Sequence, residues 1–303
     1  MSDSPPDRWL VLRVPAPGDE DRRGLLVEVL RDLTPHGVEE RPDALVAYLP
    51  APEESPAFLA QEIGGRLARA VGETVPLRVE TTWQAHEAWS DLWREGFRSR
   101  RITSRIVVAP TWDPPDPEPG DVILTLDPGM AFGTAEHPTT RGCLRLLDSR
   151  VLPGIRVADI GAGSGVLSIA AALLGAARVL AVELDPWAVS AARENAKMNG
   201  VDDRVEVRAA AVGPSFLPGE APFHGIVANI EAGILLPLLP GFQGGLEPGG
   251  WVILSGILAT EAAGVVETAE ALGLELEEED REESWWSGAF RNRSPGPGGG
   301  VAG

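Results

Sequence analysis

The chain of 303 residues has few of the side chains on which several kinds of enzyme chemistry depend. It contains one cysteine, Cys143, which excludes an internal disulfide and fits a reducing compartment. Its one lysine, Lys197, leaves little room for Schiff-base chemistry. The four histidines have no metal-ligand spacing, and no Ser/His/Asp arrangement is evident. The sequence therefore predicts neither a metal site nor covalent catalysis.

Basic residues are also scarce, because 26 lysines and arginines stand against 45 aspartates and glutamates and leave a formal net charge of −19. Nucleic-acid binding needs clustered lysine and arginine, so this composition disfavours it. It favours basic partners, although solubility alone also explains much of such a charge.

Two features of a secreted or membrane protein are missing as well. Residues 1–7 lack the basic and apolar regions of a signal peptide. The most apolar stretch, 166–182, is broken by Gly175 and Arg178, which predicts a buried helix and a strand instead of a membrane span. We therefore expect a cytoplasmic protein without membrane contact.

Residues 1–80 predict a small α+β domain. Apolar runs and turn signals predict strands at 9–14, 38–41, 44–49 and 75–79 and helices at 19–33 and 55–70. This order of strand, helix, strand, strand, helix, strand is typical of a ferredoxin-like sandwich. No catalytic cluster lies in it, so binding is the simplest interpretation of its role.

Residues 81–118 predict a tryptophan-rich helical linker followed by a proline-rich loop. Trp89, Trp93 and Phe97 share one helical face, which favours packing between domains, with aromatic contact to a substrate as the alternative. A strand is expected at 105–109, and the loop at 110–119 is too rich in proline for a helix.

Residues 119–293 predict a parallel sheet with helices, because strand and helix patterns alternate. Residues 274–280 and 285–290 predict a closing antiparallel hairpin, whose acidic run at 277–283 we expect to be solvated. The tail at 294–303, rich in glycine and proline, is predicted to be disordered.

The most informative motif is a short apolar strand that ends in Asp159 and is followed by glycines at 161, 163 and 165. Glycines at a strand-to-helix turn let a ligand approach the backbone. A dinucleotide site would place a glycine where Val166 stands, and Asp159 would repel a pyrophosphate. The acid suits S-adenosylmethionine, which carries an ammonium and a sulfonium; a tight turn without a ligand is the alternative. Glu183 ends the next strand, where a ribose-binding acid is expected.

Three further segments carry a resemblance to a known family: 126–140, 227–233 and 108–112. Together with the glycine loop, they resemble the signature of the PrmA family, the bacterial methyltransferases of large-subunit ribosomal protein eleven, across nearly the whole chain. The resemblance implies an α/β fold, with a Rossmann-like class I methyltransferase domain of doubly wound, mostly parallel sheet. It also implies a smaller N-terminal ferredoxin-like α+β domain that recognises the substrate.

The implied activity is transfer of methyl groups from S-adenosyl-L-methionine to the α-amine and lysine amines of that basic ribosomal protein. We expect a monomer with no direct nucleic-acid partner. Carried over position by position, the expected cofactor contacts are Thr140, Asp159, Gly161, Gly163, Gly165, Glu183, Asn229, Phe132 and Gly133. The expected catalytic residues, where donor and amine meet, are Asn229, Phe132 and Thr134.

The chain departs from the family pattern at three places. The family usually has Gly-Thr where this chain has Ala135-Glu136. It usually has leucine where Glu231 stands and proline where Ile234 stands. It usually has aspartate where Glu183 stands. Alanine at 135 would be strained if the loop needs a positive φ there. The added acids Glu136 and Glu231 favour a cationic substrate or mark a different target.

Methyl transfer to an amine depends on alignment and on a neutral nitrogen. An apolar wall of Phe132, Met130 and Ile230 would lower the pKa of an amine by desolvation. The Asn229 amide oxygen would accept an N–H, and His137 would brace the loop or, alternatively, act as a general base.

Three other functions remain open: a methyltransferase of another protein or small amine, an NAD-dependent oxidoreductase, and a non-catalytic S-adenosylmethionine-binding module. Val166 and Asp159 disfavour the oxidoreductase, and the intact signature loop disfavours the non-catalytic module.

Overall fold

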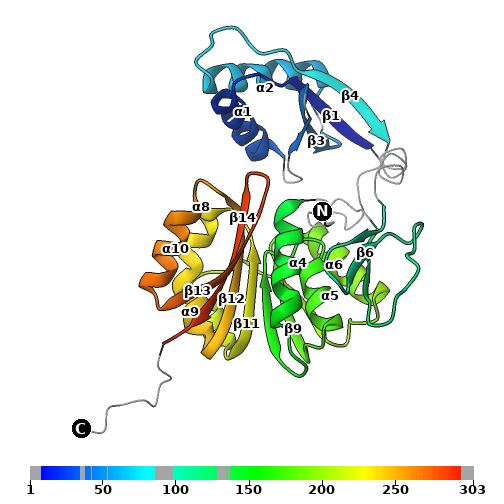
Figure 1. The fold of residues 1–303 in the computed structure, drawn as a ribbon. Coiled ribbons are helices and arrows are strands. Elements are labelled where there is room, and N and C mark those ends of the chain that lie inside the picture. The colour runs from blue at the N-terminus through cyan, green and yellow to red at the C-terminus, as the bar shows by residue number, and fades with distance from the viewer. Residues whose placement is uncertain are drawn as a thin grey trace. The chain divides into compact units, whose positions relative to one another are not determined.

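The computed structural model describes residues 8–34, 38–41, 43–52, 54–85, 98–127, 135 and 137–294. The chain divides into two compact units, Met1–Gly96 and Phe97–Gly303, which are described separately (Figure 1). No helix among these described residues is long and apolar enough to cross a membrane.

The first unit is a four-stranded antiparallel sheet with two helices. Its elements are β1 (Arg8–Pro15), α1 (Glu20–Leu33), β2 (Val38–Glu40), β3 (Ala44–Pro50), α2 (Pro56–Ala70) and β4 (Glu80–Ala85). The strand order β2-β3-β1-β4 confirms the ferredoxin-like prediction. Alternate residues of β1, Leu10, Leu12 and Val14, are buried with Leu26 and Leu30 of α1. The helix α2 begins as expected, with Pro56 in its first turn and Ser55 Oγ accepting from Phe58 N.

The last strand of this unit lies later in the chain than predicted. Residues 75–79 are not a strand, because Leu77 N donates to the carbonyl oxygen of Gly64 in α2 at 3.0 Å. A side chain at position 64 would meet Leu77 O at 2.3 Å, so the missing Cβ of Gly64 lets this segment lie against the helix. The strand β4 begins only at Glu80, and it contains Trp83, which the sequence placed in a helix. The first unit therefore runs past residue 80, and Trp89, Trp93 and Phe97 lie outside the described residues.

The segment predicted as a linker contributes a small sheet to the second unit. Its strands are β5 (Arg100–Arg101), β6 (Ile106–Ala109) and β7 (Val122–Thr125), so the predicted strand at 105–109 is confirmed. Asn199 attaches this sheet to the rest of the unit, because its amide accepts from Thr125 N at 2.8 Å and donates to Thr125 O at 2.7 Å.

A seven-stranded sheet forms the second unit's centre, with the order β10-β9-β8-β11-β12-β14-β13. Its strands are β8 (Arg156–Ile160), β9 (Arg178–Glu183), β10 (Val205–Ala209), β11 (Phe223–Asn229), β12 (Leu246–Leu258), β13 (Leu274–Glu282) and β14 (Trp285–Asn292). The helices are α4 (Pro138–Arg150), α5 (Val166–Leu173), α6 (Pro186–Met198), α7 (Phe216–Glu220), α8 (Ala232–Leu235), η1 (Leu236–Leu238), α9 (Leu239–Gly245) and α10 (Ala262–Ala271). The first five strands in this order are parallel, and β14 is antiparallel to both neighbours, as the predicted hairpin requires.

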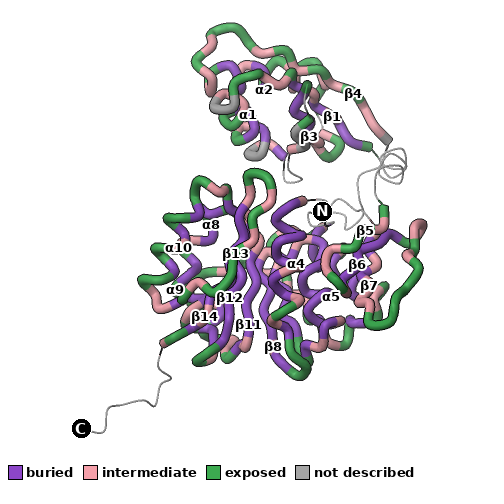
Figure 2. The backbone as a smooth tube through the Cα atoms, viewed as in Figure 1, coloured by how far each residue is buried: buried purple, intermediate pink, exposed green. Residues whose placement is uncertain are grey.

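Helices cover both faces of this sheet, and the strands are buried between them (Figures 1 and 2). Alternate strand residues face opposite sides. Val157, Val179 and Val227 pack with α4, α5 and α6, whereas Ile160 and Ile226 pack with α8, α9 and α10. The chain order reverses on either side of β8, so the doubly wound fold is confirmed. Ligands of such sheets bind where the order reverses, beyond the carboxyl ends of the strands.

The acidic run of β13 is not simply solvated. Arg145 of α4 donates to both carboxylate oxygens of Asp280 at 2.7 Å, and Arg150 donates to Glu278 at 2.7 Å. These acids pair with arginines of a helix that lies more than a hundred positions earlier in the sequence.

Candidate active site

The loop between β8 and α5 has the backbone that its glycines predicted. Gly161, Gly163 and Gly165 all have positive φ, at 73°, 54° and 80°. A Cβ at position 161 would also meet Ile230 Cγ2 at 2.5 Å, and one at 165 would meet Ala192 Cβ at 3.1 Å. Strain and crowding therefore both require glycine at these two positions.

Glu183 lies at the end of β9 and holds this loop. One carboxylate oxygen accepts from Gly163 N at 2.9 Å, and the other accepts from Leu184 N at 2.7 Å and Asp185 N at 3.0 Å. The structure thus brings together the two halves of the predicted site. The carboxylate is only partly buried, and each of its oxygens can accept more than one hydrogen bond.

Asp159 is fully buried near the end of β8. Ser168 Oγ donates to its Oδ2 at 2.6 Å, whereas Oδ1 has no hydrogen-bond partner within the described part of the chain. Burial, with a smaller contribution from the nearby Glu183 charge, raises the pKa of Asp159 to about 7, although hydrogen bonds from Ser168 oppose the shift. A cation beside Oδ1 would supply the missing partner and lower the pKa again.

Asn229 ends β11, the strand next to β8. Its Nδ2 donates to Thr140 Oγ1 at 3.4 Å, so two residues of the predicted site meet although 89 positions separate them. Its Oδ1 is buried and lacks a partner in the described ranges. Two unpartnered acceptors, Asp159 Oδ1 and Asn229 Oδ1, therefore lie on adjacent strands at the edge where a ligand is expected.

The helix α4 is capped by His137, with Pro138 in its first turn. The two threonines that follow, Thr139 and Thr140, are of a residue type more often found at an N-cap, but they lie inside the helix. His137 Nδ1 lies 2.7 Å from Thr139 Oγ1, and its ring meets the Trp285 ring edge-on with centroids 4.7 Å apart. These contacts fit the bracing role. Met130, Phe132, Gly133, Thr134 and Glu136 lie outside the described residues.

Sequence reasoning missed two polar residues that support the loop. Asn195 of α6 donates to Ser164 O at 2.9 Å, and Ser168 of α5 holds Asp159. A signal existed for Ser168, since it is a lone hydroxyl in an otherwise apolar helix. Asn195 gave no comparable signal, because its partner is a backbone oxygen that only the folded chain reveals.

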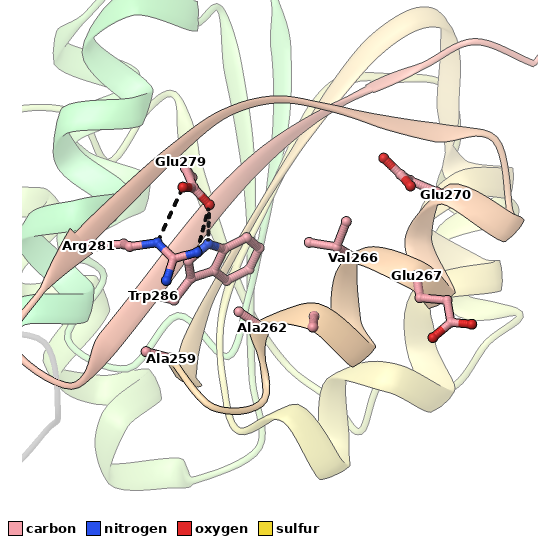
Figure 3. Close-up of a pocket in the computed structure, with 9 residues that line it drawn as sticks. Ala259, Ala262, Val266, Glu267, Glu270, Glu279, Arg281 and Trp286 are labelled. Carbon is pink, nitrogen blue, oxygen red and sulfur yellow. Dashed lines mark hydrogen bonds and ion pairs between the residues drawn. The ribbon is translucent and has the colours of Figure 1, made fainter.

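A pocket of about 460 Å³ lies elsewhere, between α10 and the edge strand β13 (Figure 3). Three of its polar side chains bond to one another: Trp286 Nε1 donates to Glu279 at 2.9 Å, and Arg281 pairs with the same carboxylate at 3.2 Å. It contains none of the predicted site residues. No group of acids, histidines and cysteine among the described residues has the arrangement of a metal site.

The site fits the cofactor that the glycine motif predicted. Three features suit a ligand with a ribose and a cationic amino-acid end: the glycine loop, an acid at each of two strand ends, and two buried acceptors that no described residue pairs with. Together with the strand order, these features define a class I S-adenosylmethionine-dependent methyltransferase.

The comparison with known families agrees. The sequence model of the family "Ribosomal protein L11 methyltransferase (PrmA)" matches residues 32–293, and the chain belongs to that family. Its enzymatic class and its cofactor, S-adenosyl-L-methionine, follow from this membership.

Individual relatives cover most of the chain. A ribosomal protein L11 methyltransferase of Geobacter sulfurreducens is 40% identical over 267 residues, covering 87% of each chain. One of Geobacter metallireducens is 42% identical over 218 residues, covering 72% of this chain and 71% of the relative. A crystal structure of a ribosomal protein L11 methylase from Lactobacillus delbrueckii subsp. bulgaricus is 31% identical and superimposes with a TM-score of 0.58, covering 65% of this chain and 100% of the other.

Proposed function

We propose that this enzyme transfers methyl groups from S-adenosyl-L-methionine to the α-amine and lysine amines of large-subunit ribosomal protein eleven. Family membership over residues 32–293 and the names of the relatives support this substrate. The structural observation that carries the proposal is the pair of buried acceptors beside the glycine loop, Asp159 Oδ1 and Asn229 Oδ1, for which the described residues supply no hydrogen-bond partner.

Each residue of the site has a distinct role in this proposal. Gly161, Gly163 and Gly165 let the cofactor approach the backbone, and Glu183 binds its ribose hydroxyls. Asp159 and Asn229 receive the cationic methionine end, and Thr140 holds Asn229 in place through the 3.4 Å hydrogen bond.

We assign three residues outside the described ranges to the wall where donor and amine meet: Phe132, Gly133 and Thr134. Phe132 and Ile230 desolvate the amine, whereas Asn229 and Thr134 orient it. Glu231, which stands at the N-cap of α8 two positions after Asn229, adds negative charge on the side where a cationic substrate enters.

The cofactor supplies a methyl group on a positively charged sulfur, so the chain's residues have to align a neutral amine with it. Deprotonating a lysine at pH 7 costs about 4.6 kcal/mol, and an α-amine near pKa 8 costs about 1.4 kcal/mol. An apolar wall reduces this cost because desolvation disfavours the ammonium form. We therefore expect lysine methylation to keep rising with pH above about 8, where α-amine methylation levels off.

The first unit, whose described elements carry no counterpart of this site, is proposed to recognise the protein substrate. The formal charge of −19 attracts a basic ribosomal protein and disfavours direct nucleic-acid contact. We further propose that the enzyme is a cytoplasmic monomer without membrane contact.

The test is incubation of the purified chain with methyl-labelled cofactor and a panel of separately purified ribosomal proteins, followed by mass spectrometry. The proposal predicts label on protein eleven, at its α-amine and at lysines. Label on another protein instead would show that Ala135-Glu136 and Glu231 mark a different target. No label on any amine would overturn the proposal.

A further inference from the structure

Three arginines of α4 pair with acids of β13, and one of them, Arg141, also contacts Ala135, which precedes the helix. Arg145 binds Asp280 and Glu282, and Arg150 binds Glu278. Arg141 donates to Glu282 Oε1 from Nε at 2.9 Å and from Nη2 at 2.6 Å. Its Nη1 also donates to the backbone oxygen of Ala135 at 3.2 Å.

The backbone of Ala135 lies in the left-handed region with φ 62°. Alanine is disfavoured in this region because its Cβ crowds the backbone. The residue is also 2% exposed, so its conformation is fixed by its surroundings. The Arg141 hydrogen bond lies on the peptide that follows Ala135, where it can hold that conformation.

The hairpin of β13 and β14 also contacts His137, which is the next described residue after Ala135. Trp285 of β14 meets the His137 ring, and His137 caps α4 through Thr139. The adjoining ends of β13 and β14 thus contact the start of α4 at two points. Glu282 pairs with Arg141, and Trp285 packs against His137. Thr140, in the first turn of this helix, contacts Asn229.

We propose that Arg141, anchored by Glu282, is a positioning residue for methyl transfer: it holds the backbone at Ala135 and thereby sets the entry into α4 and the placement of Thr140 against Asn229. The inference rests on the proposed role of Asn229 at the methionine end of the cofactor. Arg141 is 7% exposed, and the nitrogens of its planar guanidinium donate to Glu282 and to Ala135 O at the same time. A lysine ammonium cannot reproduce this geometry.

The experiment compares Arg141→Lys with Arg150→Lys in the full chain. Both substitutions keep the charge, and both weaken an ion pair between α4 and β13, but Arg150 makes no contact with Ala135. We expect Arg141→Lys to lower kcat/KM about 10-fold and Arg150→Lys to change it less than 2-fold, with similar losses of Tm. Equal kinetic effects in the two variants would overturn the proposal.

A second variant separates positioning from general structural damage. Ala135→Gly in the Arg141→Lys background removes the penalty of the left-handed conformation, so the backbone keeps its shape without the arginine. We expect about 5-fold recovery of the lost kcat/KM. The same glycine added to Arg150→Lys should recover nothing. Failure of Ala135→Gly to recover activity in the Arg141 variant would also overturn the proposal.

Calorimetric titration with S-adenosyl-L-methionine keeps this test independent of the protein substrate. Arg141→Lys should bind the cofactor about 5-fold more weakly than Arg150→Lys, and Ala135→Gly should restore the affinity. If the wild-type enzyme fails to methylate protein eleven, the proposed substrate is wrong, while the order of these affinities still decides the role of Arg141.

Discussion

Asp159 and Glu282 are carboxylates on the same seven-stranded sheet, and their surroundings shift their pKa values in opposite directions. Burial raises the pKa of Asp159 to about 7, whereas hydrogen bonds from Arg141 and then Arg145 lower the pKa of Glu282 to about 2 despite partial burial. One Asp159 oxygen lacks a partner among the described residues, and both Glu282 oxygens accept from arginine.

The difference separates a binding region from a supporting one. At the carboxyl ends of β8 and β11, two buried acceptors have no partner from the described part of the chain, which destabilises the cofactor-free fold but leaves these acceptors available to a cation. On β13, each of Glu278, Asp280 and Glu282 pairs with an arginine of α4, so these ion pairs fix the position of α4 against β13. Four predictions test this contrast.

The largest effect is expected at Glu183. Glu183→Ala removes the proposed ribose contact, and it also removes the hydrogen bonds that the carboxylate accepts from Gly163 N in the glycine loop and from Leu184 N and Asp185 N after β9. We therefore expect about 100-fold weaker cofactor binding by calorimetry. Glu206→Ala, in the neighbouring strand β10, is the control and should leave affinity unchanged. Equal affinities of the Glu183 variant and the wild type would remove Glu183 from the site.

Asp159→Asn should weaken cofactor binding about 30-fold and yet stabilise the cofactor-free protein, because it removes a buried charge. A folded-state pKa raised from 3.8 to about 7 means that the native state binds a proton that the unfolded state has lost. Wild-type stability therefore falls as pH rises from about 4 to 7. The Tm advantage of the variant should grow over that window, and a constant difference would contradict the assignment.

Glu282→Gln should have the opposite pH dependence. A folded-state pKa lowered from 4.5 to about 2 contributes stability that is present above pH 4.5 and lost as pH falls toward 2. We expect the variant to melt about 2 °C lower at pH 7 and to approach the wild type near pH 2. Thermal melts at several pH values measure this, and a gap that widens in acid would refute the ion-pair account.

The smallest effect is expected from Ala135→Gly alone. Glycine removes the steric cost of the left-handed conformation in the folded state, but it also gives the unfolded chain more conformational entropy. The first effect is the larger, so the free energy of unfolding should rise by about 0.5 kcal/mol. Chemical denaturation of both proteins measures the difference. Destabilisation would show that Ala135 is unstrained.

The glycine loop, the placement of Glu183 and Asn229 at strand ends, and the alternation of strands and helices were predictable, because local spacing and the period of apolar residues indicate them. The doubly wound sheet was expected from the family resemblance, and the order of its strands is seen only in the structure. The start of β4 was not predictable, since it depends on the approach of Leu77 to Gly64 across the first unit. The same holds for the pairing of Arg141 with Glu282, which joins residues 141 positions apart. The N-cap of α4 was not predictable either, because threonine is a stronger capping residue than histidine and Thr139 and Thr140 lie just after His137.

The most direct test of the account is whether cofactor binding displaces a proton from Asp159. Calorimetric titration of S-adenosyl-L-methionine at pH 6.5, in two buffers that differ in ionisation enthalpy, measures proton exchange. The account predicts net proton release by the wild type and none by Asp159→Asn. Identical proton exchange in the two proteins would contradict the claim that Asp159 receives the cation.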